Sequence, residues 1–544
     1  MTSGWHDPRD IRNGVPMLAA GYTDQPYCAV SPNDRWVCVI TASMGGEGSA
    51  GEEVYSVTSD DHGASWSAPV VVENGTATPG GLPNAYANII LAPKLNGGKG
   101  RFYTVFNLNR DNVSMSGRGD ELGFFYMRYS DDAGGSWSKD RHLVPYPNTW
   151  VDRQNDFKGK THIMWTVDHV KVLADGSTAA FAFTKIGRYV QNPPEEVFFM
   201  ASPNLLSEPD AAAVRWTLLP AASDHGVRAP AMYDPNTTVM EEGHLLPLRR
   251  GGCVAMARTD KGFLAAAKTS DSTAAAGWGP TGLARYWDPR RADAELVELE
   301  DIPLAAANTT YRTALKSERG PFTPKLHPSG SWLLLFYNSM AGRDPYFLTA
   351  GVEDDDGNVL WGQPELAMYD PRYHGGTSAG GYPDFIFSGS GGGNGRGRGG
   401  DGAGDGHGGG DGGATYITAA QKAALDANRS TAYVHQVDGY LLSLLLGQRT
   451  RAAPPEPDRL AAAWTGYDAG RALPLAQRWP SLDPRAQQQA GEGFSIVLEL
   501  PAGEGLLAGM PLLRSGSLAM QIAASGATIE LTLIASNSSS SASS

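Results

Sequence analysis

The feature that most constrains the fold is an eight-residue motif that occurs twice. Residues 59–66 read SDDHGASW and residues 130–137 read SDDAGGSW, so both match S-x-D-x-G-x-S-W. In such a motif the Asp carboxylate can accept backbone N–H bonds, Gly permits a positive φ, and Trp fills the gap between neighbouring strands. We therefore interpret the shared positions as structural turn residues: Ser59, Asp61, Gly63, Trp66, Ser130, Asp132, Gly134 and Trp137. A degenerate third copy is predicted at residues 270–278.

Around these turns the chain reads as a series of short strands. From Tyr27 onward, β-rich runs alternate with Gly, Asp, Asn and Pro, and long helical periods are few. Hairpins of this kind recur in about six units, and four strands make one propeller blade. The pattern predicts an all-β protein whose main part is a six-bladed β-propeller.

Composition shifts suggest where the propeller begins and ends. We expect an N-terminal extension at residues 1–20 and the propeller at residues 21–450. The Gly-rich stretch at residues 389–413 cannot repay the entropy of ordering, and we expect a disordered loop inside a hairpin of the last blade. Residues 451–492 read as a linker, and residues 493–544 as a truncated β-sandwich remnant with a Ser-rich tail.

The charge balance limits the classes of partner. The chain has 44 Lys and Arg against 58 Asp and Glu, a formal charge of −14, and no basic run of the kind that neutralises phosphates. Nucleic acid is therefore not an expected partner. A few arginines focused in a cleft could still bind an anionic sugar, because a local field can outweigh the mean surface charge.

Cofactors, membrane spans and disulfides are not expected either. Cys28, Cys38 and Cys253 lack metal-ligand spacing, and we predict three free, mostly buried thiols. No zinc constellation or phosphate loop emerges, so no metal or nucleotide cofactor is predicted. The chain has no apolar stretch of about 18 residues and begins without a signal-peptide pattern, which predicts no membrane span and a cytoplasmic location by default.

The repeated motif resembles the Asp box, or BNR repeat, of sialidases (neuraminidases) and related propellers. Further segments resemble a branch of sialidase-like proteins that often carries a laminin-G-like sandwich after the propeller: GYTDQPY, ASPNLLSE, GNVLWGQPELAMYD, GGYPDF and AYVHQVDGYLLSLL. The resemblance covers most of the chain. It implies a carbohydrate site at the central mouth and a truncated laminin-G-like domain at residues 493–544.

The resemblance also implies a mechanism and site residues. Retaining sialidases use a tyrosine nucleophile helped by a glutamate, because a phenol stays neutral beside the substrate's own carboxylate. Tyr382, just before a hairpin, matches the nucleophile, and Glu242 matches the assisting glutamate. Arg258 and Arg343 match the second and third arginines of the clamp that binds the substrate carboxylate.

Other matches are partial. Glu47, in a loop that also holds Glu52 and Glu53, is the best match to the general acid. Asp24 stands where the family has its first arginine, and a carboxylate there would repel a substrate carboxylate.

Three further positions complete the comparison with the branch. With Asp24, the neighbouring Gln25 predicts a polar site at the top of the first inner strand, and Asp384 and His435 resemble residues retained in the branch. We include Gln25 and Asp384 among the expected sugar-binding residues, whereas His435 also fits an ordinary strand histidine. Residues 418–422 read TAAQK where relatives often have a glutamate.

These observations favour a retaining exo-glycosidase that acts on terminal, possibly anionic, sugars. They leave open a glycan-binding propeller without catalysis, motivated by the missing arginine and glutamate. A hydrolase or lyase acting on uronic-acid or neutral polysaccharides, and a degenerate product without a site, also remain open. The enzyme hypothesis requires that Tyr382, Glu242, Arg258 and Arg343 meet at the axis of the propeller.

Overall fold

The structure, a computed structural model, is all-β with a propeller-like arrangement of sheets. It divides into two compact units, Met1–Pro455 and Glu456–Ser544. It describes residues 7–75, 83–111, 113, 118–188, 192–221, 223–232, 234, 236–286, 314–317, 320–338, 343–371, 380–388, 414–421, 430–448, 495–499, 511–515, 518–525 and 528–535. The predicted Gly-rich loop at 389–413 and the whole predicted linker at 451–492 lie outside these residues.

In the first unit the strands of each sheet pair antiparallel, mostly in chain order. The first sheet comprises β2 (Tyr22–Val30), β3 (Trp36–Ser43), β4 (Glu53–Ser59) and β5 (Val70–Glu73). A long sheet follows, comprising β6 (Asn84–Ala92), β7 (Arg101–Leu108), β8 (Leu122–Ser130), β10 (His162–Trp165), β12 (Ala179–Arg188), β13 (Asn192–Ser202) and β14 (Thr217–Leu219), with β9 (His142–Leu143) on β8 and β11 (Lys171–Val172) on β12.

Three further sheets complete the described part of this unit. One comprises β15 (Glu241–Pro247), β16 (Cys253–Arg258), β17 (Leu264–Thr269) and β18 (Gly282–Leu283). The next comprises β19 (Thr323–Leu326), β20 (Trp332–Phe336), β21 (Tyr346–Glu353) and β22 (Val359–Trp361), with β23 (Glu365–Met368) on β21. The last comprises β24 (Asp384–Phe387), β25 (Thr415–Gln421), β26 (Ser430–Gln436) and β1 (Val15–Ala20).

The helices of the described residues are short and lie in segments that connect or flank the strands. The α-helices are α1 (Trp150–Gln154) and α2 (Gly439–Gly447), and the 3₁₀ helices are Ile11–Asn13, Asn96–Gly98 and Ala211–Ala213. In the described residues, no helix is both long and apolar enough to cross a membrane.

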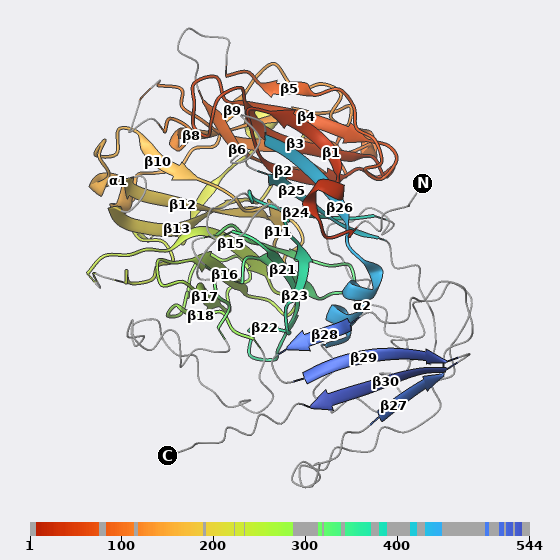
Figure 1. Cartoon of the computed structure of the whole chain (residues 1–544). Helices are drawn as coiled ribbons and strands as arrows, with labels where there is room; N and C mark the ends of the chain where they lie inside the picture. Colours follow the sequence, from red (N-terminus) through yellow and green to blue (C-terminus); the bar gives the residue numbers. More distant parts are fainter. Residues whose placement is uncertain are drawn as a thin grey trace, which may run out of the picture. The chain divides into compact units, whose positions relative to one another are not determined.

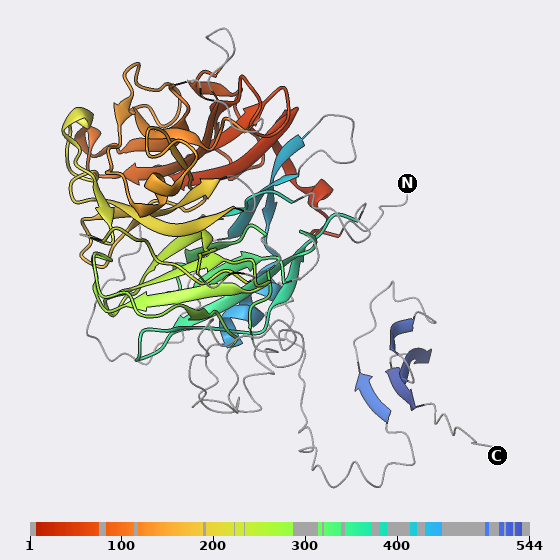
Figure 2. The same cartoon turned by 90° about the vertical axis from the view of Figure 1, so that its left-hand side faces the viewer.

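The sheets follow one another around the unit in chain order, and the last one returns beside the first (Figures 1 and 2). Strands of successive sheets contact each other: β2 contacts β6, β12 contacts β15, β15 contacts β19, and β24 contacts β2. The long sheet is joined at β8 and β10 by the pairs His162–Gly123 and Ile163–Leu122. The number of blades depends on whether this long sheet is counted as one blade or is divided between β8 and β10. Six blades therefore stay a prediction.

The N-terminal strand belongs to the last sheet. β1 pairs antiparallel with β26, from Val15 opposite Val434 to Ala20 opposite Ser430. The predicted extension at residues 1–20 therefore needs correction, because its last six residues form an edge strand of the sheet that contains β24–β26. The two ends of the first unit are hydrogen-bonded to each other, which closes the ring of sheets.

The two repeated turns have matching hydrogen bonds. In the first, Gly63 N–H donates to Ser59 Oγ at 2.8 Å, and Ser65 donates through its N–H and hydroxyl to the Asp61 carboxylate at 2.8 and 2.6 Å. In the second, the corresponding bonds measure 2.9, 2.8 and 2.6 Å. Gly63 and Gly134 have φ values of 83° and 85°, a region that favours glycine.

The tryptophan of the second turn fills a gap between sheets. Trp137 donates from Nε1 to Ser56 Oγ of the neighbouring sheet at 2.8 Å. At the degenerate third turn, Asp271 accepts the N–H and hydroxyl of Thr273 at 2.8 and 2.7 Å. Trp278 there stacks on Phe199 with ring centroids 5.1 Å apart.

The prediction of three free thiols is wrong. Cys28 and Cys38 form a disulfide, whereas Cys253 is free and buried. The reason is register: Cys28 on β2 lies directly opposite Cys38 on β3, with a Cα–Cα distance of 4.0 Å. An odd number of cysteines does not exclude one such pair.

The second unit contains a four-stranded antiparallel sheet in the order β27-β30-β29-β28. Its strands are β27 (Ser495–Glu499), β28 (Pro511–Ser515), β29 (Leu518–Ser525) and β30 (Thr528–Ala535). A laminin-G-like identity for this unit stays a prediction.

Candidate functional site

Three innermost strands share a backbone irregularity near their N-terminal ends. The pairing register shifts between Asp24 and Tyr27 in β2, between Ala85 and Asn88 in β6, and between Glu241 and His244 in β15. Each bulge contains a non-glycine residue at positive φ: Gln25 at 53°, Tyr86 at 55° and Glu242 at 50°. A bulge re-aims a side chain, and positive φ is strained for such residues, so strain is concentrated around one end of the ring.

Glu242 and Tyr382 form the centre of this region. The Tyr382 hydroxyl donates a short hydrogen bond to Glu242 Oε1, although the two residues lie far apart in the chain. Trp165 Nε1 donates to the same oxygen at 3.3 Å, and the Glu242 N–H donates to Thr184 Oγ1 at 2.7 Å. Both Tyr382 and Glu242 are buried. Their geometry therefore provides a phenol beside a proton acceptor, sheltered from bulk water.

Two arginines act on this pair. Arg258, the last residue of β16, places a guanidinium nitrogen 2.7 Å from Glu242 Oε2 and another 3.3 Å from Glu241 Oε2. Arg343 lies close enough for its charge to lower the pKa of both Tyr382 and Glu242. The structure thus gathers four predicted site residues, Tyr382, Glu242, Arg258 and Arg343.

Burial sets the protonation of the pair. Burial, followed by the Glu242 charge, raises the pKa of Tyr382 well above its ordinary value. Burial also raises the pKa of Glu242, while the Arg258 guanidinium opposes this rise. At neutral pH the phenol therefore keeps its proton and donates a hydrogen bond to Glu242.

Asp24 holds the backbone that carries Tyr382. One oxygen of the buried Asp24 carboxylate accepts the N–H of Tyr382 and of Gln25, both at 2.9 Å, and the other accepts the Tyr22 hydroxyl at 2.9 Å. The Gln25 side chain is turned to Thr41, whose hydroxyl lies 3.4 Å from Gln25 Oε1. These three hydrogen bonds stabilise the negative charge of the Asp24 carboxylate.

The glycine before Tyr382 is fitted to this clamp. A Cβ at Gly381 would lie 2.3 Å from Asp24 Oδ1. The Gly381 N–H donates to the Ala420 carbonyl at 2.8 Å, and its own carbonyl accepts the Tyr346 hydroxyl at 2.7 Å. The segment before Tyr382 is thereby fixed on both sides.

Glu47 lies in a second cluster, around Arg118. One Arg118 nitrogen is 3.3 Å from Glu47 Oε1, 2.7 Å from Asp120 Oδ2 and 3.2 Å from Glu121 Oε1. Tyr86 accepts from Arg118 at 3.0 Å and donates to Asp120 at 2.9 Å. We call Arg118, Glu47, Asp120, Glu121 and the adjacent Glu52 the Arg118 cluster.

The Arg118 cluster adjoins the Tyr382–Glu242 pair. The ring of Tyr86 lies 6.4 Å from that of Trp165, the residue that donates to Glu242. The charges of Glu47 and Glu52 also reach Tyr22, the partner of Asp24. Sequence reasoning missed Arg118. Asp120 and Glu121 follow it in the run RGDE, but Glu47 comes from a distant loop and only the fold brings it to Arg118.

Asp384 belongs to a buried polar network between the inner strands. Its carboxylate lies 2.8 Å from Lys325 Nζ and 3.2 Å from His169 Nε2, and it accepts the Cys28 N–H at 2.8 Å. The structure therefore places Asp384 on Lys325 and His169 rather than on Glu242.

Asp168 extends this network. Its carboxylate contacts Lys171, and His244 Nδ1 lies 2.9 Å from its Oδ1. It also accepts the N–H groups of Ala182 and Leu245 at 2.8 and 3.1 Å. Sequence reasoning missed these residues. The available signal was Asp168 and His169 inside the otherwise apolar run MWTVDHVKV.

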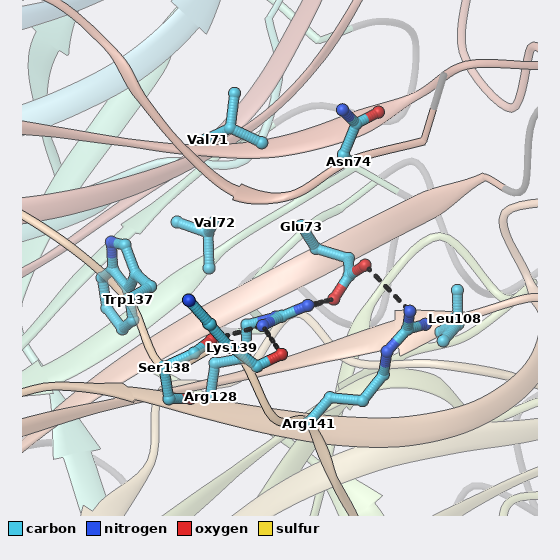
Figure 3. Close-up of a pocket in the computed structure, with 10 residues that line it drawn as sticks. All are labelled: Val71, Val72, Glu73, Asn74, Leu108, Arg128, Trp137, Ser138, Lys139 and Arg141. Carbon is cyan, nitrogen blue, oxygen red and sulfur yellow. Dashed lines mark hydrogen bonds and ion pairs between the residues drawn. The ribbon is translucent and has the colours of Figure 1, made fainter. Parts of the chain in front are cut away.

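The structure also has a surface cavity of about 450 Å³, whose lining includes neither Tyr382 nor Glu242 (Figure 3). It is lined by Val71, Val72, Glu73, Asn74, Leu108, Arg128, Trp137, Ser138, Lys139 and Arg141. Arg128 donates to Glu73 at 2.8 Å, and Arg141 lies 3.6 Å from the other oxygen of Glu73. Because the buried Glu73 already neutralises arginine charge, we interpret the cavity as a gap between sheets, not as the functional site.

Comparison with known proteins gives structural likeness without sequence matches. No family model matches the chain, and no curated protein sequence matches it significantly. A Hadza microbial sialidase is 14% identical with a TM-score of 0.47, over 78% of this chain and 68% of that one. A leech intramolecular trans-sialidase is 13% identical with a TM-score of 0.48, over 82% and 72%. The Trypanosoma rangeli sialidase is 12% identical with a TM-score of 0.46, over 94% of this chain and 69% of that one.

Proposed function

We propose that the chain is a retaining exo-glycosidase with sialidase-like architecture that cleaves a terminal sugar from glycans. The observation that carries this proposal is the hydrogen bond from the Tyr382 phenol to the Glu242 carboxylate, buried and flanked by Arg258. A nucleophile hydrogen-bonded to a base, with the base oriented by a third group, is the arrangement that covalent catalysis needs.

The proposed first step forms a tyrosyl glycoside. The Tyr382 oxygen attacks the anomeric carbon while Glu242 accepts the phenolic proton, and the bond to the leaving oxygen breaks. Glu47, half-exposed beside Arg118, is the proposed acid that protonates this oxygen. In the second step water attacks the anomeric carbon, Glu47 accepts a proton from it, and the Tyr382 oxygen leaves with the proton held by Glu242.

The test is hydrolysis of a panel of aryl sialosides, uronides and neutral glycosides by the protein and by Tyr382→Phe. We expect the variant to lose at least about 10³-fold in kcat on any substrate that the protein hydrolyses, because the nucleophile is removed. Tyr433→Phe, which removes a hydroxyl from β26, is the matched control and should retain activity. Unchanged hydrolysis by Tyr382→Phe would exclude the tyrosine as nucleophile.

A glycan-binding propeller without catalysis is the second candidate. It is favoured by Asp24, which stands where the resemblance predicts an arginine and whose carboxylate is engaged by Tyr382, Gln25 and Tyr22. Binding on a glycan array, combined with no turnover of the panel and no effect of Tyr382→Phe on binding, would favour this candidate.

A further inference from the structure

Carboxyl groups outnumber guanidinium groups around the candidate site. Among the described residues, the Tyr382–Glu242 pair and the Arg118 cluster bring together seven carboxyl groups and three guanidinium groups. The carboxyl groups belong to Asp24, Glu47, Glu52, Asp120, Glu121, Glu241 and Glu242, and the guanidinium groups to Arg118, Arg258 and Arg343.

Protonation of some of these carboxyl groups reduces the excess of acidic over basic groups but does not reverse it. Burial, followed by the charge of Asp120, raises the pKa of Glu52 and Glu121 well above the ordinary value. Burial also raises the pKa of Glu242. Even with these three groups neutral, four acidic groups remain beside three guanidinium groups.

Acidic groups of the protein already engage Arg118 and Arg258. Arg118 is held by Glu47, Asp120 and Glu121, and Arg258 by Glu241 and Glu242. The charge of Glu242 also favours the charged form of Arg343. A substrate carboxylate would have to compete with these partners inside a buried site, where like charges are weakly screened.

Asp24 further disfavours binding of a substrate carboxylate near Tyr382. Its carboxylate accepts the backbone N–H of Tyr382, and its charge raises the pKa of the Tyr382 phenol, so it acts on the proposed nucleophile. A sugar with a carboxylate on or next to its anomeric carbon would add a further negative charge to the surroundings of this phenol. A sugar without a charge meets no such repulsion.

We propose that the glycone is a neutral sugar, and not a sialic or uronic acid. This inference rests on the proposed function and specifies its substrate class. It also explains, from the charges of the protein itself, why a tyrosine would serve as the nucleophile. In a site crowded with Asp24, Glu241 and Glu242, a phenol that is neutral until it reacts is a better nucleophile than a further carboxylate.

The experiment compares kcat/KM across 4-methylumbelliferyl glycosides. The anionic members are the α-sialoside and the β-glucuronide, and the neutral members are α- and β-linked galactosides, glucosides, mannosides, fucosides, xylosides and N-acetylhexosaminides. We expect the best neutral substrate to exceed both anionic ones by about 100-fold or more, since juxtaposed like charges cost several kcal/mol.

Asp24→Asn tests whether charge is the cause. Asparagine keeps an oxygen that can accept the Tyr382 N–H but removes the negative charge. The ratio of neutral to anionic kcat/KM should fall, and a ratio cancels any general loss from misplacement of Tyr382. Asp175→Asn makes the same charge change in an exposed hairpin turn between β11 and β12 and should leave the ratio unaltered.

The outcomes separate this inference from the proposed function. Sialoside or glucuronide turnover that equals or exceeds the best neutral substrate, and is lost in Tyr382→Phe, would overturn the inference while the proposed function stands. Neutral preference with an unchanged ratio in Asp24→Asn would overturn the charge argument. Turnover of no panel member would contradict the proposed function itself.

Discussion

Asp24 illustrates how the role of a residue depends on its partners. From its position in the sequence, a carboxylate at the mouth is expected to face the substrate. In the structure the same carboxylate accepts hydrogen bonds from Tyr382, Gln25 and Tyr22. Asp24 is therefore a positioning residue for the nucleophile as well as a source of negative charge, and Gly381 is small because Asp24 lies against it.

Arg258 should set the acidic limit of activity. Its charge lowers the pKa of Glu242, and the carboxylate is the form that accepts the Tyr382 proton. In Arg258→Gln the pKa of Glu242 rises further, so the acidic limb of the kcat/KM profile should move to higher pH. Arg250→Gln, on the exposed turn between β15 and β16, is the control. An unmoved limb in Arg258→Gln would show that Glu242 is not the titrating base.

At this scale the resemblance proposed Tyr382, Glu242, Arg258 and Arg343, and the structure brings these residues together. It could not propose Arg118 or Asp168. Each has nearby partners in the chain but also distant ones, Glu47 for Arg118 and His244 for Asp168, and the distant contacts leave no spacing in the sequence. Asp384 was expected at the sugar, but its charged-group partners, Lys325 and His169, lie on segments whose proximity only the ring of sheets creates.

Among the elements, the repeated turns depend on one buried hydroxyl each. Ser130 Oγ donates to Asp132 at 2.7 Å and accepts the N–H of the buried Gly134 at 2.9 Å. The motif could be recognised from sequence because all its partners lie within eight residues. The pairing of β1 with β26 could not, because the two strands are more than 400 residues apart and meet only when the ring closes.

Ser130→Ala should destabilise the first unit by about 1–2 kcal/mol, because a buried N–H loses its acceptor. The free energy of unfolding from urea titration measures this. Ser136→Ala, in the exposed part of the same turn, removes only the hydroxyl bond to Asp132 and should cost less. Equal losses in the two variants would show that burial of the Gly134 N–H is not what matters.

For the whole molecule, the closing seam between β1 and β26 contains a histidine that resists protonation. Burial lowers the pKa of His435 from 6.5 to about 4. A Cβ at Gly14 would lie 2.2 Å from His435 Nε2, so the N-terminal segment packs directly against the imidazole ring of His435. As pH falls, His435 takes up a proton at higher pH in the unfolded chain than in the folded one. The contribution of the neutral imidazole to the free energy of unfolding is therefore full above pH 6.5 and is lost as pH falls toward 4.

We therefore expect His435 to account for about 2 kcal/mol of lost stability between about pH 7 and pH 5. Urea unfolding at both pH values should show a smaller difference in His435→Gln than in the unaltered chain. His142→Gln, in β9, is the control for loss of a histidine elsewhere. An equal pH dependence in His435→Gln and the unaltered chain would contradict a role for the seam in acid sensitivity.

The bond between Asp24 and the Tyr382 backbone also dictates an order of events during synthesis. The ribosome releases Asp24 early, but its partner Tyr382 emerges 358 positions later. No nascent fragment that stops short of β24 can assemble the nucleophile, whatever else has folded. Activity should thus appear only after the chain has been synthesised at least as far as Tyr382.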